Sequence, residues 1–205
     1  MKAVYDDIMM MKPRYETLGE NLFWVYAVRQ AIATVVNSGE MEIGKRFYVY
    51  RSLFYGKFKD GKQKISDFYD VNKRKFQADS YCFYCQKEIP KIELTADHVF
   101  PRCKGGTNDM DNIIFVCKNC NSSKGKLDLI EWFLLYQDRF PPTFVLGHYL
   151  RQIYAYAMEN DLMGKRFEEV CQMQLPFNPR SILLLCNGEA VNYYFKYALQ
   201  ERGID

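Results

Sequence analysis

The sequence predicts an α+β chain that is mostly helical, with one small β-containing module between two helical regions. Three observations lead to this prediction. Apolar residues recur at helical spacing in the first third of the chain and again near its end. From Tyr81 to about Lys126, that periodicity gives way to paired cysteines, glycines and two short β-prone runs. We therefore expect three regions, residues 1–78, 79–138 and 139–205.

The first region is predicted to contain three helices. Thr17 to Glu20 has the sequence of a capping box, and the residues that follow place apolar side chains along one helical stripe. Asn37, Ser38 and Gly39 are a plausible stop for this helix. Two more amphipathic helices are expected at residues 45–55 and 66–76, with a lysine-rich loop at residues 57–64 between them.

The middle and last regions alternate short strands with helices. Residues 92–100 and 112–117 are strand candidates, joined by a connection rich in Pro, Gly, Asn and Asp. The later helices are expected at residues 126–140, which Pro141 and Pro142 stop, at residues 145–160, after Asn178-Pro179, and at residues 189–203. His148 falls within this helical periodicity and is read as a packing or surface residue.

The charge of the chain is unevenly distributed. A formal net charge of +3 over 205 residues is too small to indicate a nucleic-acid partner by itself. Residues 45–75, however, hold ten Lys or Arg against three Asp. Such a stretch can follow a phosphate backbone, and Lys73, Arg74 and Lys75 are its candidate contacts. The alternative is a solvated helix face followed by a lysine-rich loop.

No apolar run approaches the roughly 20 residues that a membrane-spanning helix needs, so no membrane partner is expected. The first residues carry acids and a proline where a secretory signal needs an unbroken apolar stretch, which favours a cytoplasmic protein. In a reducing compartment, paired CxxC motifs indicate a metal site rather than disulfides.

Four of the seven cysteines form two such pairs, Cys82 with Cys85 and Cys117 with Cys120. A two-residue spacer lets both sulfurs of a turn face the same point, so two turns can offer four thiolates to one tetrahedral Zn²⁺. The sequence therefore predicts a structural zinc site. The alternative is four unligated thiols that pair by chance, and the three remaining cysteines are expected to be small buried groups.

The residues between and just after the two pairs have the chemistry of a catalytic site. Asp97 and His98 lie in the first strand candidate, Asn112 opens the second, and Asn121 directly follows the last paired cysteine. The segments "CFYC", "ADHVFPRCKGG", "DNIIF" and "CKNCNSSKG" occur in this order. In these segments the chain resembles the HNH endonucleases, which have the ββα-metal nuclease fold, over roughly residues 81–126.

The resemblance implies a role for each of these side chains. His98 corresponds to the general base, a task for which imidazole is suited near neutral pH. Asp97 and Asn121 correspond to the ligands of the catalytic cation, and Asn112 to the residue that orients the histidine by a hydrogen bond. The last ligand position is often histidine in this family. The oxygen of Asn121 favours Mg²⁺ or Mn²⁺ there.

Two further basic residues, Arg102 and Lys124, are candidate phosphate contacts because each lies near a ligand position in the sequence. A solvated side chain is the alternative for each of them. At Asp97 and His98, the alternative is a hydrogen-bonded surface pair.

Three functions are compatible with this sequence. The first is a metal-dependent endonuclease that hydrolyses phosphodiester bonds in DNA, as restriction, mobile-element and anti-phage defence proteins do; RNA is a further possible substrate. The second is a non-catalytic zinc-containing module that binds nucleic acid. The third is a nuclease subunit whose helical flanks dock on a partner protein. A homodimer would be the simplest arrangement for a double-strand break.

Overall fold

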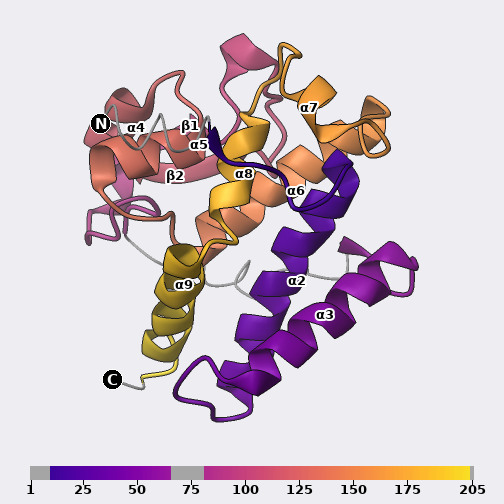
Figure 1. Ribbon diagram of the computed structural model, residues 1–205. Helices are drawn as coiled ribbons and strands as arrows, with labels where there is room; N and C mark the ends of the chain where they lie inside the picture. Colours follow the sequence, from indigo (N-terminus) through magenta and orange to yellow (C-terminus); the bar gives the residue numbers. More distant parts are fainter. Residues whose placement is uncertain (1–9, 66–80, 204–205) are drawn as a thin grey trace. The chain divides into compact units, whose positions relative to one another are not determined.

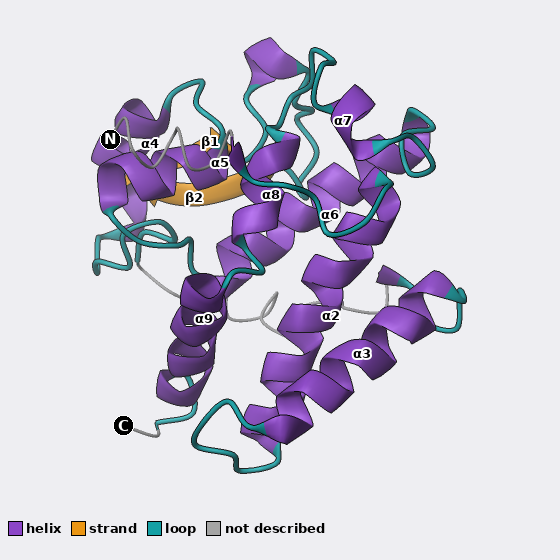
Figure 2. Ribbon diagram, viewed as in Figure 1, coloured by secondary structure: helices purple, strands orange, loops and turns teal. Residues whose placement is uncertain are grey.

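The structure is a computed structural model that describes residues 10–65 and 81–203 (Figure 1). These residues are mostly helical and contain one two-stranded antiparallel sheet (Figure 2), which confirms the predicted fold class. The predicted helix at residues 66–76 and the candidate phosphate contacts Lys73, Arg74 and Lys75 lie outside the described residues. None of the described helices is long and apolar enough to cross a membrane.

Contacts within the chain divide the described residues into two compact units. The first comprises residues 81–156 and 174–178, and therefore holds both cysteine pairs and both strands. The second comprises residues 10–65, 157–173 and 179–203. Segments from the two ends of the chain thus fold together in the second unit.

The second unit is built around helix α2 (Leu18–Asn37), which contacts α3, α8 and α9. Thr17 caps this helix as predicted, since its hydroxyl accepts a hydrogen bond from the Glu20 amide at 3.2 Å; the Glu20 carboxylate accepts from that same hydroxyl at 3.3 Å rather than from the Thr17 backbone amide that would complete a capping box. The chain leaves the helix through Gly39, whose φ of 84° suits glycine.

Helix α3 (Lys45–Lys59) continues beyond residue 55, where the sequence predicted its end, and includes the first residues of the segment 57–64 that was expected to be a loop. Phe58 is buried, and the Lys59 ammonium lies 2.9 Å from a Glu20 carboxylate oxygen on α2. These contacts hold the last turn of α3 against α2. The helix then ends at Asp60 and Gly61, where the glycine has a φ of 68°.

The C-terminal helices of this unit are short. They are α7 (Phe167–Val170), α8 (Pro179–Leu184) and α9 (Gly188–Gln200). Helix α8 begins at the proline that the sequence marked as a helix start. The Asn187 side chain caps α9 by accepting a hydrogen bond from the Ala190 amide at 2.7 Å.

The first unit contains a short hairpin and a helix that follows it directly. Strand β1 (Leu94–His98) pairs antiparallel with β2 (Ile113–Cys117), so that His98 lies opposite Ile113. Helix α4 (Lys118–Lys124) contacts both strands. Two 3₁₀ turns flank β1 in the sequence: η3 (Lys91–Glu93) precedes the strand and η4 (Arg102–Lys104) follows it.

The predicted helix at residues 126–140 is shorter than expected at both ends. It consists of α5 (Leu129–Trp132) and a π-helical segment, η5 (Phe133–Gln137). It starts late because the Asp128 carboxylate caps it, accepting hydrogen bonds from the Ile130 and Glu131 amides at 3.0 and 3.2 Å. It ends before the two prolines because Asp138 adopts a left-handed conformation, with a φ of 51°.

Helix α6 (Thr143–Glu159) carries the second histidine of the chain. His148 is buried, its ring lies 4.5 Å from that of Phe144, and its Nδ1 is 3.2 Å from the Asp111 carbonyl oxygen. The structure therefore confirms His148 as a packing residue.

Candidate functional site

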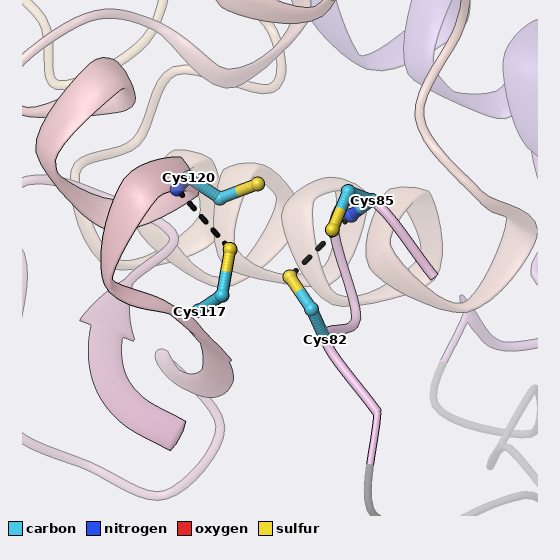
Figure 3. A group of neighbouring side chains, drawn as sticks. All are labelled: Cys82, Cys85, Cys117 and Cys120. Carbon is cyan, nitrogen blue, oxygen red and sulfur yellow. Dashed lines mark hydrogen bonds between the residues drawn. The ribbon is translucent and has the colours of Figure 1, made fainter. Parts of the chain in front are cut away.

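The four paired cysteines converge on one point (Figure 3). Their sulfur atoms all lie within 4.8 Å of one another, and they form the one group of three or more His, Cys, Asp or Glu side chains with metal-binding geometry in the described residues. Four sulfurs at about 2.3 Å from a tetrahedral Zn²⁺ would be about 3.8 Å apart. The donor set and its spacing therefore fit a structural zinc ion.

Each cysteine pair is held in a tight turn by its own backbone. The Cys85 amide lies 3.4 Å from the Cys82 sulfur, and the Cys120 amide lies 3.4 Å from the Cys117 sulfur. Both amides donate, so they favour the negatively charged thiolate form that binds metal. The first turn closes at Gln86, whose amide bonds to the Cys82 carbonyl at 2.7 Å and whose φ is 61°.

Hydrogen bonding between the thiols of the cluster also favours a thiolate. The hydrogen bond between the Cys82 and Cys120 thiols lowers the pKa of Cys82 to about 4 and raises the pKa of Cys120. Burial raises the pKa of Cys85. The Cys82 sulfur is thus favoured as a thiolate, the form that binds a metal ion.

Asp97 lies on the inner face of β1 and is almost fully buried. Its Oδ2 accepts a hydrogen bond from the Tyr84 hydroxyl at 2.7 Å and lies 3.0 Å from the Lys124 ammonium. Its Oδ1 has no hydrogen-bond partner among the described residues. The carboxylate is therefore fixed through one oxygen, and the other oxygen is left for a ligand.

Lys124 contributes more than a charge to this arrangement. Its ammonium also donates to the His98 carbonyl oxygen at 2.8 Å, and the residue is 1% exposed. Burial lowers the pKa of Lys124, and the Asp97 carboxylate opposes that shift. The prediction that Lys124 contacts phosphate therefore needs correction: in this structure the ammonium is an internal counter-ion with no surface to offer a phosphate.

Replacing Lys124 by methionine should lower the free energy of unfolding of the first unit by about 3–5 kcal/mol, because a buried carboxylate and a carbonyl lose their cation. Urea denaturation followed by Trp132 fluorescence in a Trp24→Phe background would measure the loss. Lys126→Met, an exposed lysine two residues away, is the matched control and should change little. Equal effects of the two substitutions would contradict the ion-pair assignment.

His98 is the last residue of β1 and is half-buried. Its Nε2 lies 2.9 Å from the Asn108 side-chain oxygen. Since that oxygen can only accept, Nε2 carries the proton and Nδ1 of the neutral ring keeps its lone pair. Asn108, in the loop between the strands, thus orients the imidazole and selects its tautomer.

Asn112 does not orient His98 in this structure, contrary to what the resemblance implied. Its side chain accepts from the Phe100 amide at 2.7 Å and donates to the Phe100 and Thr107 carbonyls at 3.0 and 2.9 Å. The Asn112 carbonyl accepts from the Val99 amide at 2.9 Å, so the backbone and the side chain of Asn112 both bond to residues that follow His98. Asn112 is fully buried and holds the two ends of the loop together.

The same loop depends on Gly106. A Cβ at this position would lie 1.8 Å from the Phe100 carbonyl oxygen and 2.9 Å from the Asn112 side-chain nitrogen, distances that no side chain tolerates. Glycine is therefore required for the loop to close against Phe100. The glycine turn that follows Asp97 and His98 in the sequence is thus a packing requirement of the loop that holds Asn108.

Asn121 is held against β1 from the first turns of α4. Its side-chain nitrogen donates to the Thr95 hydroxyl at 3.0 Å and to the Ala96 carbonyl at 3.1 Å. Its carboxamide oxygen has no hydrogen-bond partner among the residues that the structure describes. The structure therefore places Asn121 beside the residues that precede Asp97, with an oxygen available to a ligand.

The candidate phosphate contact Arg102 is exposed, in the loop that follows His98. Lys104 is also exposed there, although the sequence argument did not select it. The sequence argument also missed Tyr84 and Asn108. Tyr84 lies inside "CFYC", but that motif does not predict its hydrogen bond to Asp97, which lies 13 positions later in the chain.

Comparisons with known proteins match the part of the chain that holds this site. Residues 82–128 match the sequence profile of the family described as HNH endonuclease. A segment of 52 residues is 38% identical to the CRISPR-associated endonuclease Cas9 of Corynebacterium diphtheriae (strain ATCC 700971 / NCTC 13129 / Biotype gravis). This segment is 25% of the present chain and 5% of that protein. No solved structure matches the chain.

Proposed function

We propose that the first unit, with its segment matching the HNH endonucleases, is a metal-dependent endonuclease that hydrolyses phosphodiester bonds in DNA. The observation that supports this proposal is that Asp97 and His98 on β1 and Asn121 on α4, which bonds to β1, belong to the same hairpin and helix that carry Cys117 and Cys120 of the cysteine cluster. A zinc-binding module without catalytic function would not need, in one hairpin and helix, an oriented imidazole and two oxygens that the described residues leave without a partner.

In the proposed reaction His98 acts as the general base. Its Nε2 is occupied by Asn108, so Nδ1 is the atom that accepts a proton from the attacking water. Lys124 bonds to the His98 carbonyl and thereby fixes the end of the strand that carries the ring. Exposed Arg102 is proposed to contact a flanking phosphate of the substrate.

The second element of the site is the pair of unpartnered oxygens on Asp97 and Asn121. A carboxylate and a carboxamide oxygen suit a hard divalent cation, Mg²⁺ or Mn²⁺. When bound, such a cation would polarise the phosphate and neutralise charge that develops on its oxygens. Tyr84 and Lys124 limit Asp97 to one free oxygen and so orient it for this purpose.

Supercoiled plasmid should be nicked or linearised in the presence of Mg²⁺ or Mn²⁺ and stay intact after these ions are removed by buffer exchange. Buffer exchange is preferable to a chelator because zinc content can then be checked and kept constant. An RNA of the same sequence, tested in parallel, would separate DNA from RNA as substrate.

Two results would contradict the proposal in different ways. Cleavage supported by Ni²⁺ or Zn²⁺ but not by Mg²⁺ or Mn²⁺ would overturn the assignment of Asp97 and Asn121 as hard oxygen ligands. No cleavage of either nucleic acid by folded protein with stoichiometric zinc, whatever the added cation, would overturn the nuclease itself.

A further inference from the structure

The second unit contains a cavity of about 170 Å³ that has no part in the proposed reaction. It is lined by the segment that precedes α2, by α2 itself, and by the junction between α8 and α9. A cavity of about 150 Å³ can hold a benzene molecule. This cavity is therefore large enough for a compact anion such as phosphate.

Its charged residues are all basic. Lys12 and Arg14 line the cavity, and no acidic residue does. Arg14 places its guanidinium carbon 4.3 Å from the centre of the Trp24 ring, which also lines the cavity, and Arg51 on α3 places its own 4.4 Å from the same ring. None of these three cations forms an ion pair with a described residue.

Two guanidinium groups on one indole repel each other unless an anion lies near them. The Arg51 Nε is buried and has no hydrogen-bond partner among the described residues. Burial, followed by the charge of Arg14, lowers the pKa of Arg51. Cys186, which also lines the cavity, supplies no compensating charge, because burial raises the pKa of its thiol to about 12. The cluster therefore contains positive charge that the described residues leave uncompensated.

The same contacts favour a phosphate group over an aromatic base. Two guanidinium groups already lie against the Trp24 ring, and the Tyr15 ring is stacked on that of Tyr55 at 4.5 Å. These ring faces are therefore already in contact with other side chains. The Asn21 side chain is used up by hydrogen bonds to the backbone of Tyr15 and Thr17. What remains for a ligand is a set of cationic N–H donors, which suits the oxygens of a phosphate.

We propose that this cavity binds a phosphate monoester dianion or inorganic phosphate, with Arg14 and Lys12 from its lining as ligands and with Arg51, against the Trp24 ring, adding positive charge. The phosphate could belong to a free nucleotide or to the end of a DNA strand. The proposal concerns a site within the second unit and does not depend on whether the first unit cleaves DNA.

Trp24 provides the test, since it is one of two tryptophans in the chain. Titration of the full chain with inorganic phosphate at constant ionic strength should change tryptophan fluorescence saturably. The change should be lost in Trp24→Phe, while isothermal calorimetry measures binding in every variant. We expect Arg14→Gln to weaken the affinity at least tenfold, and Arg51→Gln to do the same. Arg46→Gln, an exposed arginine on α3 paired with Glu40, removes the same charge and should leave the affinity unchanged.

Three ligands distinguish the possible sources of the phosphate: inorganic phosphate, a deoxynucleoside 5′-monophosphate, and an oligonucleotide with or without a 5′-phosphate. Tighter binding of the 5′-phosphorylated oligonucleotide than of its 5′-hydroxyl form, abolished by Arg14→Gln, would identify a DNA end. The absence of saturable binding of any phosphate to the folded wild type would overturn the proposal. So would equal weakening by Arg14→Gln and Arg46→Gln.

Discussion

Replacing His98 by alanine should slow plasmid cleavage by about two to four orders of magnitude, the usual contribution of a general base. The substitution should not unfold the first unit, because the ring is half-buried and hydrogen-bonds, among the described residues, to Asn108 alone. Zinc content and the urea unfolding curve should therefore match those of the wild type. Rates of supercoiled plasmid loss under saturating Mg²⁺ would measure the effect.

Two further variants connect this loss to the chemistry of the ring. In His98→Gly, added imidazole should restore part of the activity, which it would not do for a residue with a purely structural role. Asn108→Ala should cause a smaller loss of about tenfold, because the imidazole is present but no longer held in one tautomer. Cleavage at the wild-type rate by His98→Ala would remove His98 as the base.

The sequence predicts those parts of the site that depend on local spacing. A CxxC turn places its two sulfurs on one side whatever follows it, and the four sulfurs do converge within 4.8 Å. The Thr17 cap and the helix start at Pro179 are equally local, and both are present. In these two cases and within each cysteine pair, the residues that interact lie within a few positions of one another, whereas the meeting of the two pairs joins segments 31 residues apart.

The parts that the sequence did not predict depend on contacts between distant residues. Lys124 was read as a surface cation because of its charge, yet it is buried against Asp97, which lies 27 positions earlier. Asn112 was expected to contact His98, but Asn108 occupies that place. The direction of each of these side chains depends on the strand register and on how the loop closes. The pattern of residue types in the sequence specifies neither of them.

The basic stretch at residues 45–75 illustrates the same limit. Its net charge suggested a path for a phosphate backbone, yet in its described part Lys59 pairs with Glu20 and Lys62 with Asp60. Arg51 lies against Trp24 rather than on an open basic face. Much of the charge in α3 and the turn after it is therefore used within the second unit, and the uncompensated part lies beside the proposed phosphate cavity.

Cys82→Ser or Cys120→Ser should release the metal and unfold the cysteine turns and the hairpin. Two strands of five residues are too small to be stable alone, and they need a further source of stability. Zinc bound by four thiolates supplies about 10–16 kcal/mol in small zinc modules, as much as the whole stability of a typical domain. The loss of one ligand should therefore affect the fold before it affects the chemistry.

Trp132 makes this loss observable, because its ring lies 5.0 Å from that of Tyr84, inside the first cysteine turn. In a Trp24→Phe background, either cysteine variant should shift Trp132 emission to longer wavelength and contain less than one zinc per chain. Cys103→Ser is the matched control, since Cys103 is exposed and outside the cluster, and it should keep both zinc and emission. If Cys82→Ser retained one zinc per chain and an unchanged unfolding transition, the four sulfurs would be neighbours without being ligands. The hairpin that positions Asp97 and His98 would then owe its stability to the contacts of Tyr84 and Lys124 instead.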